Sequence, residues 1–205
     1  MSHHTETLMN KLTITAACAA LLIGGSGAWA AEKEGIPGVR GMDHIGFTVP
    51  DIDQGVDFFR DVIGCTEVMR FGPFSDNKGT FMKDLVNVHP RAVIKQIAMM
   101  RCGDGSNIEL FQYSAPDQKT EMPRNSDYGG FHLAFYVKDI KAAVDKARAL
   151  GLQTFMGPFE LTEGPAAGES ITYVLTPWGM QLELISYPDG MAYEKDAKTK
   201  LWAPE

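Results

Sequence analysis

One pattern of ten residues occurs twice in this chain. D-H-I-G-F-T-V-P-D-I begins at Asp43, and F-H-L-A-F-Y-V-K-D-I begins at Phe131, a shift of 88 positions. Each copy is followed at a distance by an apolar run that contains one acid, N-I-E-L-F-Q-Y around Glu109 and M-Q-L-E-L-I-S-Y around Glu183. Repetition at a fixed spacing indicates two structural units of the same kind within one chain.

Each unit is expected to start with a strand and continue into a helix. Residues 44–49 alternate apolar side chains with polar or small ones, which is the period of a half-buried strand. Asp51 then caps a predicted helix that Gly64 ends, and the second copy repeats both signals 88 positions later. Three strand-like runs follow each helix: 66–71, 93–101 and 107–113, then 153–155, 170–175 and 180–187. The predicted fold is α+β, with two tandem βαβββ modules that form a curved sheet cleft.

The first 30 residues are expected to be a cleaved signal peptide. Lys11 precedes an apolar run, and Ala28-Trp29-Ala30 supplies a cleavage site with small residues at the required positions. The run is shorter than the roughly 20 residues that span a bilayer, so we expect a periplasmic or secreted protein with no membrane contact after cleavage. The rest divides into an N-terminal arm, a first module, a linker, a second module and a C-terminal tail, at 31–41, 42–116, 117–130, 131–188 and 189–205.

The charge of the chain narrows the classes of partner that it is expected to bind. The formal net charge is −7 and no stripe of Lys and Arg exists, so a nucleic acid is not expected as a partner.

Cys65 and Cys102 remain after cleavage, in a compartment expected to be oxidising. If the strands around Val68 and Ile97 pair antiparallel, the two cysteines lie nearly opposite each other. A disulfide and a pair of buried free thiols are the two alternatives.

Strand geometry predicts where the candidate ligands point. Side chains two apart share a face of the sheet, so His44 lies with Thr48 on the face away from the helix. The same count places Glu109, His132 and Glu183 on that face. Two imidazoles and two carboxylates suit one divalent ion of Zn, Ni, Co, Mn or Fe. The residues expected to line the cleft and contact a small-molecule substrate are Thr48, Phe111, Tyr113, Tyr136 and Tyr187.

The chain resembles the vicinal oxygen chelate superfamily, which includes glyoxalase I, methylmalonyl-CoA epimerase, extradiol dioxygenases and bleomycin-resistance proteins. The resemblance covers residues 42–188 and rests on M-D-H-I-G-F-T-V-P-D-I, H-L-A-F-Y-V-K-D-I and T-P-W-G-M-Q-L-E-L. It implies the same four metal ligands, with Glu183 as the first choice for the catalytic base and Glu109 as the second. Many relatives assemble such a site across a homodimer, whereas a chain with both modules is able to complete it internally.

The resemblance implies a metal-dependent isomerase, epimerase or lyase that acts on an oxygen-chelating substrate through an enediolate. Glutathione is not the expected cosubstrate, because Thr48 and Tyr113 stand where bacterial glyoxalase I usually has the Arg and Asn that hold it. One alternative is an extradiol iron dioxygenase, although the second carboxylate would occupy the position that oxygen needs. Another is a non-catalytic binding or resistance protein, but such proteins generally lack the full ligand set.

The first module is longer than the second between its His and its Glu. The additional residues are expected in the segment 72–91, and 157–169 is the matching loop of the second copy. Loops of this length are often functional, so either segment is a candidate to close over the cleft, and a solvated surface insertion is the alternative. Lys78, Lys83 and Arg91 are candidates to hold an anionic substrate, and His89 is expected to be a loop residue.

Overall fold

The computed structural model of the chain describes residues 36–204. Among the described residues, 41–204 form one compact unit, and residues 36–40 belong to a separate first unit. The described end of the first unit is a turn in which the Val39 amide donates to the Ile36 carbonyl at 3.3 Å. The predicted signal peptide and the start of the predicted arm lie outside the described residues. Among the described helices, none has the length and apolar character needed to cross a membrane.

The first module is one mixed sheet with a helix on one face. The strand order is β1-β5-β4-β2, with β1 parallel to β5 and the other neighbours antiparallel, and β3 pairs with β4. The helix α1 packs on β4 and β5 and continues into the π-helix η1. The elements are β1 His44–Thr48, α1 Ile52–Phe58, η1 Phe59–Ile63, β2 Thr66–Phe71, β3 Phe74–Ser75, α2 Phe81–Val86, β4 Val93–Arg101 and β5 Asn107–Ser114.

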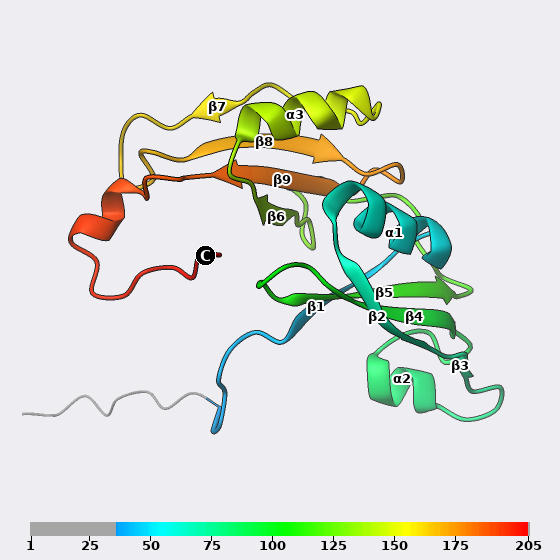
Figure 1. Cartoon of the computed structure of the whole chain (residues 1–205). Helices are drawn as coiled ribbons and strands as arrows, with labels where there is room; N and C mark the ends of the chain where they lie inside the picture. The colour runs from blue at the N-terminus through cyan, green and yellow to red at the C-terminus, as the bar shows by residue number, and fades with distance from the viewer. Residues whose placement is uncertain (1–35, 205) are drawn as a thin grey trace, which may run out of the picture. The chain divides into compact units, whose positions relative to one another are not determined.

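The second module repeats this arrangement. Its strand order is β6-β9-β8-β7, β6 is parallel to β9, and α3 lies across β8 and β9 (Figure 1). The elements are β6 Leu133–Tyr136, α3 Ile140–Ala149, β7 Phe159–Glu160, β8 Ser170–Leu175 and β9 Gln181–Ser186, followed by the short helix η2 Ala192–Lys195. The predicted α+β fold of two βαβββ modules is confirmed.

The helix boundaries follow the capping signals. The Asp51 carboxylate accepts from the Gln54 amide at 3.0 Å, and the Asp139 carboxylate accepts from the Ala142 amide at 2.9 Å. Gly64 ends the first helix in the left-handed region, at φ 93°, where a side chain would be strained. These contacts fix where each helix starts and stops.

Two short elements differ from the prediction. Residues 153–155 do not form a strand, because only Thr154 makes a bridge, to Val174. The outer strand of the second sheet is instead β7, which follows Pro158, a residue without the amide proton that a longer ladder would need. In the first module, the long segment 72–91 contains β3 and α2 rather than an open loop.

One hydrophobic core holds the two modules together. Under α1, the buried side chains come from alternate positions of the strands, as with Phe47 and Leu110. The same cluster continues through Val144, Val174 and Leu182 of the second module. Because apolar burial is the main stabilising contribution to folding, this shared cluster links the stability of the two modules.

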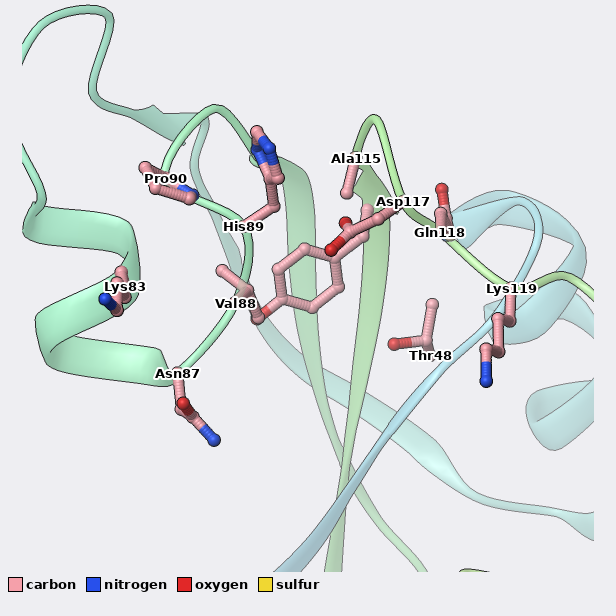
Figure 2. A pocket seen from close by; sticks show the side chains of 11 residues that line it. Thr48, Lys83, Asn87, Val88, His89, Pro90, Ala115, Asp117, Gln118 and Lys119 are labelled. Atoms are coloured by element: carbon pink, nitrogen blue, oxygen red, sulfur yellow. The ribbon is translucent and has the colours of Figure 1, made fainter.

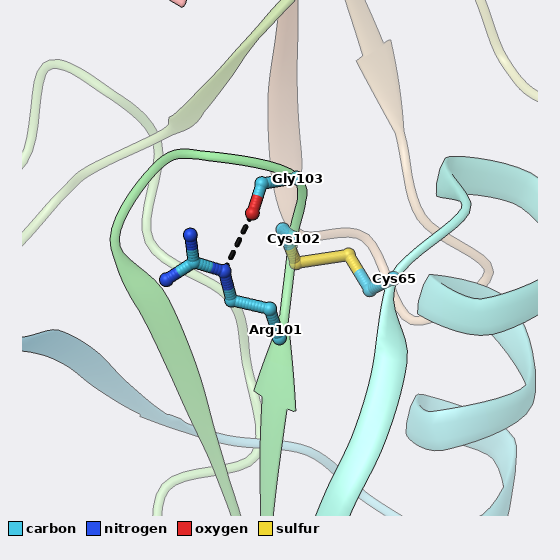
Figure 3. Close-up of a disulfide and its surroundings, with 4 residues drawn as sticks. All are labelled: Cys65, Arg101, Cys102 and Gly103. Atoms are coloured by element: carbon cyan, nitrogen blue, oxygen red, sulfur yellow. Dashed lines mark hydrogen bonds between the residues drawn. A yellow bond between two sulfur atoms is a disulfide. The ribbon is translucent and has the colours of Figure 1, made fainter.

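A disulfide lies at one end of the first sheet. Cys65 precedes β2 and Cys102 follows β4, and these two strands pair antiparallel with Thr66 opposite Arg101. The two sulfur atoms are bonded at 2.07 Å across a sequence separation of 37 residues (Figure 3). Of the two alternatives for these cysteines, the structure therefore has the disulfide.

Candidate functional site

A first pair of candidate ligands, His44 and Glu109, lies on the sheet face opposite α1. The parallel pairing of β1 and β5 places Gly46 directly opposite Glu109, and His44 one side-chain step away on the same face. The distance from His44 Nε2 to Glu109 Oε2 is 3.2 Å. The other ring nitrogen, Nδ1, lies 2.6 Å from a carboxylate oxygen of Asp43. This hydrogen bond to Asp43 is the main reason why the pKa of His44 is raised, and Glu109 adds to it.

A second pair, His132 and Glu183, occupies the corresponding place in the second module. The distance from His132 Nε2 to Glu183 Oε2 is 3.1 Å. Ala134 of β6 lies opposite Glu183, as Gly46 lies opposite Glu109. Among the described residues, Glu183 is the only charged one that is buried, whereas Glu109 is half-buried. Each module therefore presents one imidazole and one carboxylate in contact.

Two residues near the second pair were not predicted from the sequence. Tyr173 of β8 lies directly opposite Glu183, and its ring meets the His132 ring edge-on at 5.3 Å. Burial, and then the charge of Glu183, raise the pKa of Tyr173. Glu169 is half-buried, and burial followed by the charge of Glu183 raises its pKa. Only cross-strand register identifies Tyr173, and one sequence does not give that register.

Aromatic rings lie beside each pair on the same sheet face. Phe111 and Tyr113 are stacked, with 5.4 Å between ring centroids and 27° between planes. Tyr136 and Tyr187 meet edge-on at 4.9 Å. Burial, and then the charge of Glu109, raise the pKa of Tyr113. The predicted substrate-contacting aromatics thus form two groups, one in each module.

The structure does not bring the four predicted ligands to one place. Among residues 36–204, no three His, Cys, Asp or Glu side chains lie close enough together to hold one ion. The first pair belongs to one sheet and the second pair to the other, so each module of the chain provides a half-site. The chemistry of the donors still fits a divalent transition metal, since imidazole nitrogen and carboxylate oxygen are its usual ligands.

A cavity of about 610 Å³ opens at the end of β1 and β5, next to α2 (Figure 2). Thr48 and Tyr113 form the part that continues the sheet face. The remaining lining residues come from α2, the loop after it and the segment after β5: Lys83, Asn87, Val88, His89, Pro90, Ala115, Asp117, Gln118 and Lys119. Tyr113 is four residues from Glu109, which is about 13 Å along a strand. The cavity is therefore next to the first pair rather than at it.

The long segment of the first module covers one end of the aromatic face. Met82 of α2 is buried against Ile97, with Phe111 and Tyr113 packed on the same cluster. Of the three candidate cations, Lys83 lines the cavity, while the Arg91 guanidinium donates to the carbonyls of Asp76 and Gly79 within its own segment. Arg91 therefore stabilises the conformation of the segment 72–91.

The family model of the glyoxalase/bleomycin resistance protein/dioxygenase superfamily matches residues 43–173, which include the whole first sheet, the second sheet as far as the middle of β8, and three of the four candidate ligands. The chain belongs to this superfamily. Its match to a 2-epi-5-epi-valiolone epimerase from Actinomyces sp is 44% identical over 172 residues, covering 83% of this chain and 92% of that protein. The chain therefore resembles an epimerase over most of the length of both proteins.

A solved structure of a glyoxalase family protein from Bacillus cereus has the same fold. The match covers 74% of this chain and 98% of that protein, with a TM-score of 0.56 and 20% sequence identity. At that identity the similarity concerns the fold alone. The paired βαβββ modules described above are therefore a fold that the two proteins share.

Proposed function

We propose that this protein is an epimerase that inverts a stereocentre beside the carbonyl of a small cyclic ketone, with 2-epi-5-epi-valiolone or a close analogue as substrate. The observation that carries the proposal is the 44% identity to the Actinomyces epimerase across 92% of that protein. The two His–Glu pairs on the open sheet faces support it, because inversion at such a carbon needs a carboxylate to accept a proton.

The proposed metal ligands are His44, Glu109, His132 and Glu183, which would hold one divalent ion. Such an ion, when bound, polarises the substrate carbonyl as a Lewis acid. Because each module supplies two ligands and the described chain keeps the pairs apart, we propose a symmetric homodimer. In it, the first pair of one copy would face the second pair of the other, and both sites would be equivalent.

The residues of the chain would perform the proton transfer in two steps. A glutamate carboxylate takes the proton from the carbon beside the carbonyl, and the C–H electron pair moves into the carbonyl. A proton from solvent then returns to the opposite face of the same carbon as the carbonyl re-forms, and the glutamate releases the proton that it took to the solvent. The product is an isomer of the substrate, so no oxidant or second substrate is consumed. The stacked rings of Phe111 and Tyr113, and those of Tyr136 and Tyr187, would limit the access of other water molecules.

We also propose that the protein is exported and works in an oxidising compartment. The disulfide between Cys65 and Cys102 supports this location, since such bonds persist mainly outside the reducing cytosol.

The test is proton exchange in deuterated water. Protein loaded with Zn, Ni, Co, Mn or Fe is incubated with 2-epi-5-epi-valiolone, and the product is followed by NMR. We expect an epimer that carries one deuterium at the inverted carbon, and no reaction after treatment with a chelator. Absence of both epimer and exchange with all five metals would reject the proposal, and a product that contains oxygen from O₂ would indicate a dioxygenase instead.

A further inference from the structure

The cavity beside α2 is bounded by two lysines from separate parts of the chain. Lys83 belongs to α2, and Lys119 belongs to the segment that follows β5. Figure 2 shows Lys83 and Asn87 on one side of the cavity and Thr48 and Lys119 on the other. Because both lysines line the same cavity, an anion held in it would be attracted by both charges.

The described chain does not use either ammonium group internally. Among residues 36–204, the lysines that form ion pairs are Lys141 and Lys200. The last turn of α2 does not need the Lys83 side chain, because the backbone carbonyl of Lys83 accepts from the Asn87 amide at 3.0 Å. Both charges are therefore available to a ligand.

The other polar side chains of the cavity supply mainly hydrogen-bond donors. The Asn87 amide group has two N–H donors, and the Thr48 hydroxyl has one. His89 Nδ1 accepts from the Arg91 amide at 3.0 Å, so the proton of the neutral ring is on Nε2. Asp117 supplies the one carboxylate of the lining. In a chain of net charge −7, the cavity is thus locally positive and rich in donors, which suits an oxyanion.

The α2 side of the cavity is held in place before any ligand binds. Met82 is 1% exposed and packs in one cluster with Ile97. The Arg91 guanidinium donates to the carbonyls of Asp76 and Gly79, and the Asp76 carboxylate accepts from the Gly79 amide at 2.7 Å. A side that is already ordered loses little entropy when a ligand binds.

We propose that this cavity binds a phosphate monoester, with Lys83 and Lys119 as its charged contacts and with Asn87 and Thr48 as hydrogen-bond donors. A phosphate monoester carries a charge of about −1.5 to −2 at neutral pH, which two ammonium groups match. The volume of about 610 Å³ accommodates a small molecule rather than an isolated ion. The inference goes beyond the proposed function and does not depend on it, since binding is measured without turnover.

The phosphate has two possible sources. The cavity continues the sheet face of the first pair, so the group could belong to the substrate. Tyr113 is about 13 Å along the strand from Glu109, so a single small ring held at the first pair would not fill the cavity, and a separate phosphorylated compound is the other source.

The test is calorimetric titration with phenyl phosphate, with phenol as the uncharged probe and a chelator present to exclude binding through a metal ion. We expect phenyl phosphate to bind at least about tenfold more tightly than phenol. Lys83→Gln and Lys119→Gln should each weaken phenyl phosphate binding by about tenfold, because each removes a charged contact. Asp117→Asn should strengthen it by about threefold, because it removes a repulsive charge.

Lys78→Gln is the matched control, since it makes the same charge change within the segment 72–91 at a residue that does not line the cavity. We expect it to leave the affinity within about twofold. Equal binding of phenyl phosphate and phenol would overturn the proposal. Equal losses in Lys78→Gln and Lys83→Gln would overturn it too, because that result indicates attraction to surface charge in general. The substituted side chains are exposed, and thermal melts verify that the variants fold.

A kinetic measurement identifies the source of the phosphate. Deuterium exchange of 2-epi-5-epi-valiolone is followed with and without saturating phenyl phosphate. A higher KM at unchanged kcat would assign the phosphate to the substrate, because the two compounds then compete for connected space. An unchanged KM would assign it to a separate compound, whether or not kcat changes. If the wild-type protein catalyses no exchange, the proposed function fails, and the affinities of the variants still decide whether the cavity binds phosphate.

Discussion

The ring of Phe58 in the first module lies edge-on to the indole of Trp178 in the second, with 5.4 Å between the ring centroids. Phe59 lies at the same helix end and is fully buried. The centroid of its ring is 6.2 Å from that of Trp178 and 6.3 Å from that of Phe135. These rings belong to the core cluster that includes both sheets. We therefore expect the two modules to unfold as one cooperative unit.

Phe59→Ala should therefore destabilise the whole unit and not one module. Removal of a buried phenylalanine costs about 3–5 kcal/mol. We expect a lower urea midpoint with one transition, seen at the same concentration by tryptophan fluorescence and by far-UV circular dichroism. Leu150→Ala, at a side chain that is 45% exposed, is the control and should change the midpoint little. Two separate transitions in Phe59→Ala would show that the modules unfold independently.

The disulfide should contribute a large share of the stability. A cross-link across 37 residues reduces the entropy of the unfolded chain, for a stabilisation of about 2–4 kcal/mol. Replacing both Cys65 and Cys102 by alanine should lower the free energy of unfolding by that amount. A thiol reductant should lower the stability of the wild-type protein to a similar degree and leave the double variant unaffected. Equal stability of the variant and the oxidised wild type would contradict the prediction.

Glu169 should make stability depend on pH. Burial and the charge of Glu183 raise its pKa in the folded chain, so its ionised form is disfavoured there. The penalty is absent below the unfolded pKa, grows as the pH rises through the interval up to the folded pKa, and is complete above it. In metal-free protein, Glu169→Gln should thus be more stable than wild type at pH 8 and equal to it near pH 3.5. A stability difference that does not change with pH would refute this account.

Metal binding and dimer formation should depend on each other. If each ion needs one pair from each of two chains, chelation removes the ion and weakens the dimer together. We expect light scattering to give a dimer with about one metal equivalent per chain, and a shift toward monomer after chelation. His44→Ala and His132→Ala should each lose the metal. Mixing these two variants should restore metal binding at one of the two sites of a mixed dimer. Recovery at neither site, or at both, would contradict a site that is shared between two chains.

The sequence predicted local structure well because local signals determine it. Asp51 specifies where the first helix begins, and Gly64 specifies where it ends. The alternation around Phe47 specifies which face of the strand is directed toward the core. It missed α2, since six residues with one buried anchor, Met82, are too few for a helical period to be visible. It also missed Tyr173, whose place beside Glu183 depends on the register between β8 and β9. The distance between the two pairs likewise depends on how Phe58 and Trp178 pack, which no local pattern encodes.

Fusion of the two modules in one chain has a consequence for how such a protein can evolve. An assembly of identical single-module chains would carry the same residue at both equivalent positions, glycine at each or alanine at each. Here Gly46 and Ala134 are specified by separate codons, as are Met99 and Tyr173. Selection can alter one member of each pair while the other keeps its ancestral surroundings, so a site made from a repeat is free to become chemically asymmetric.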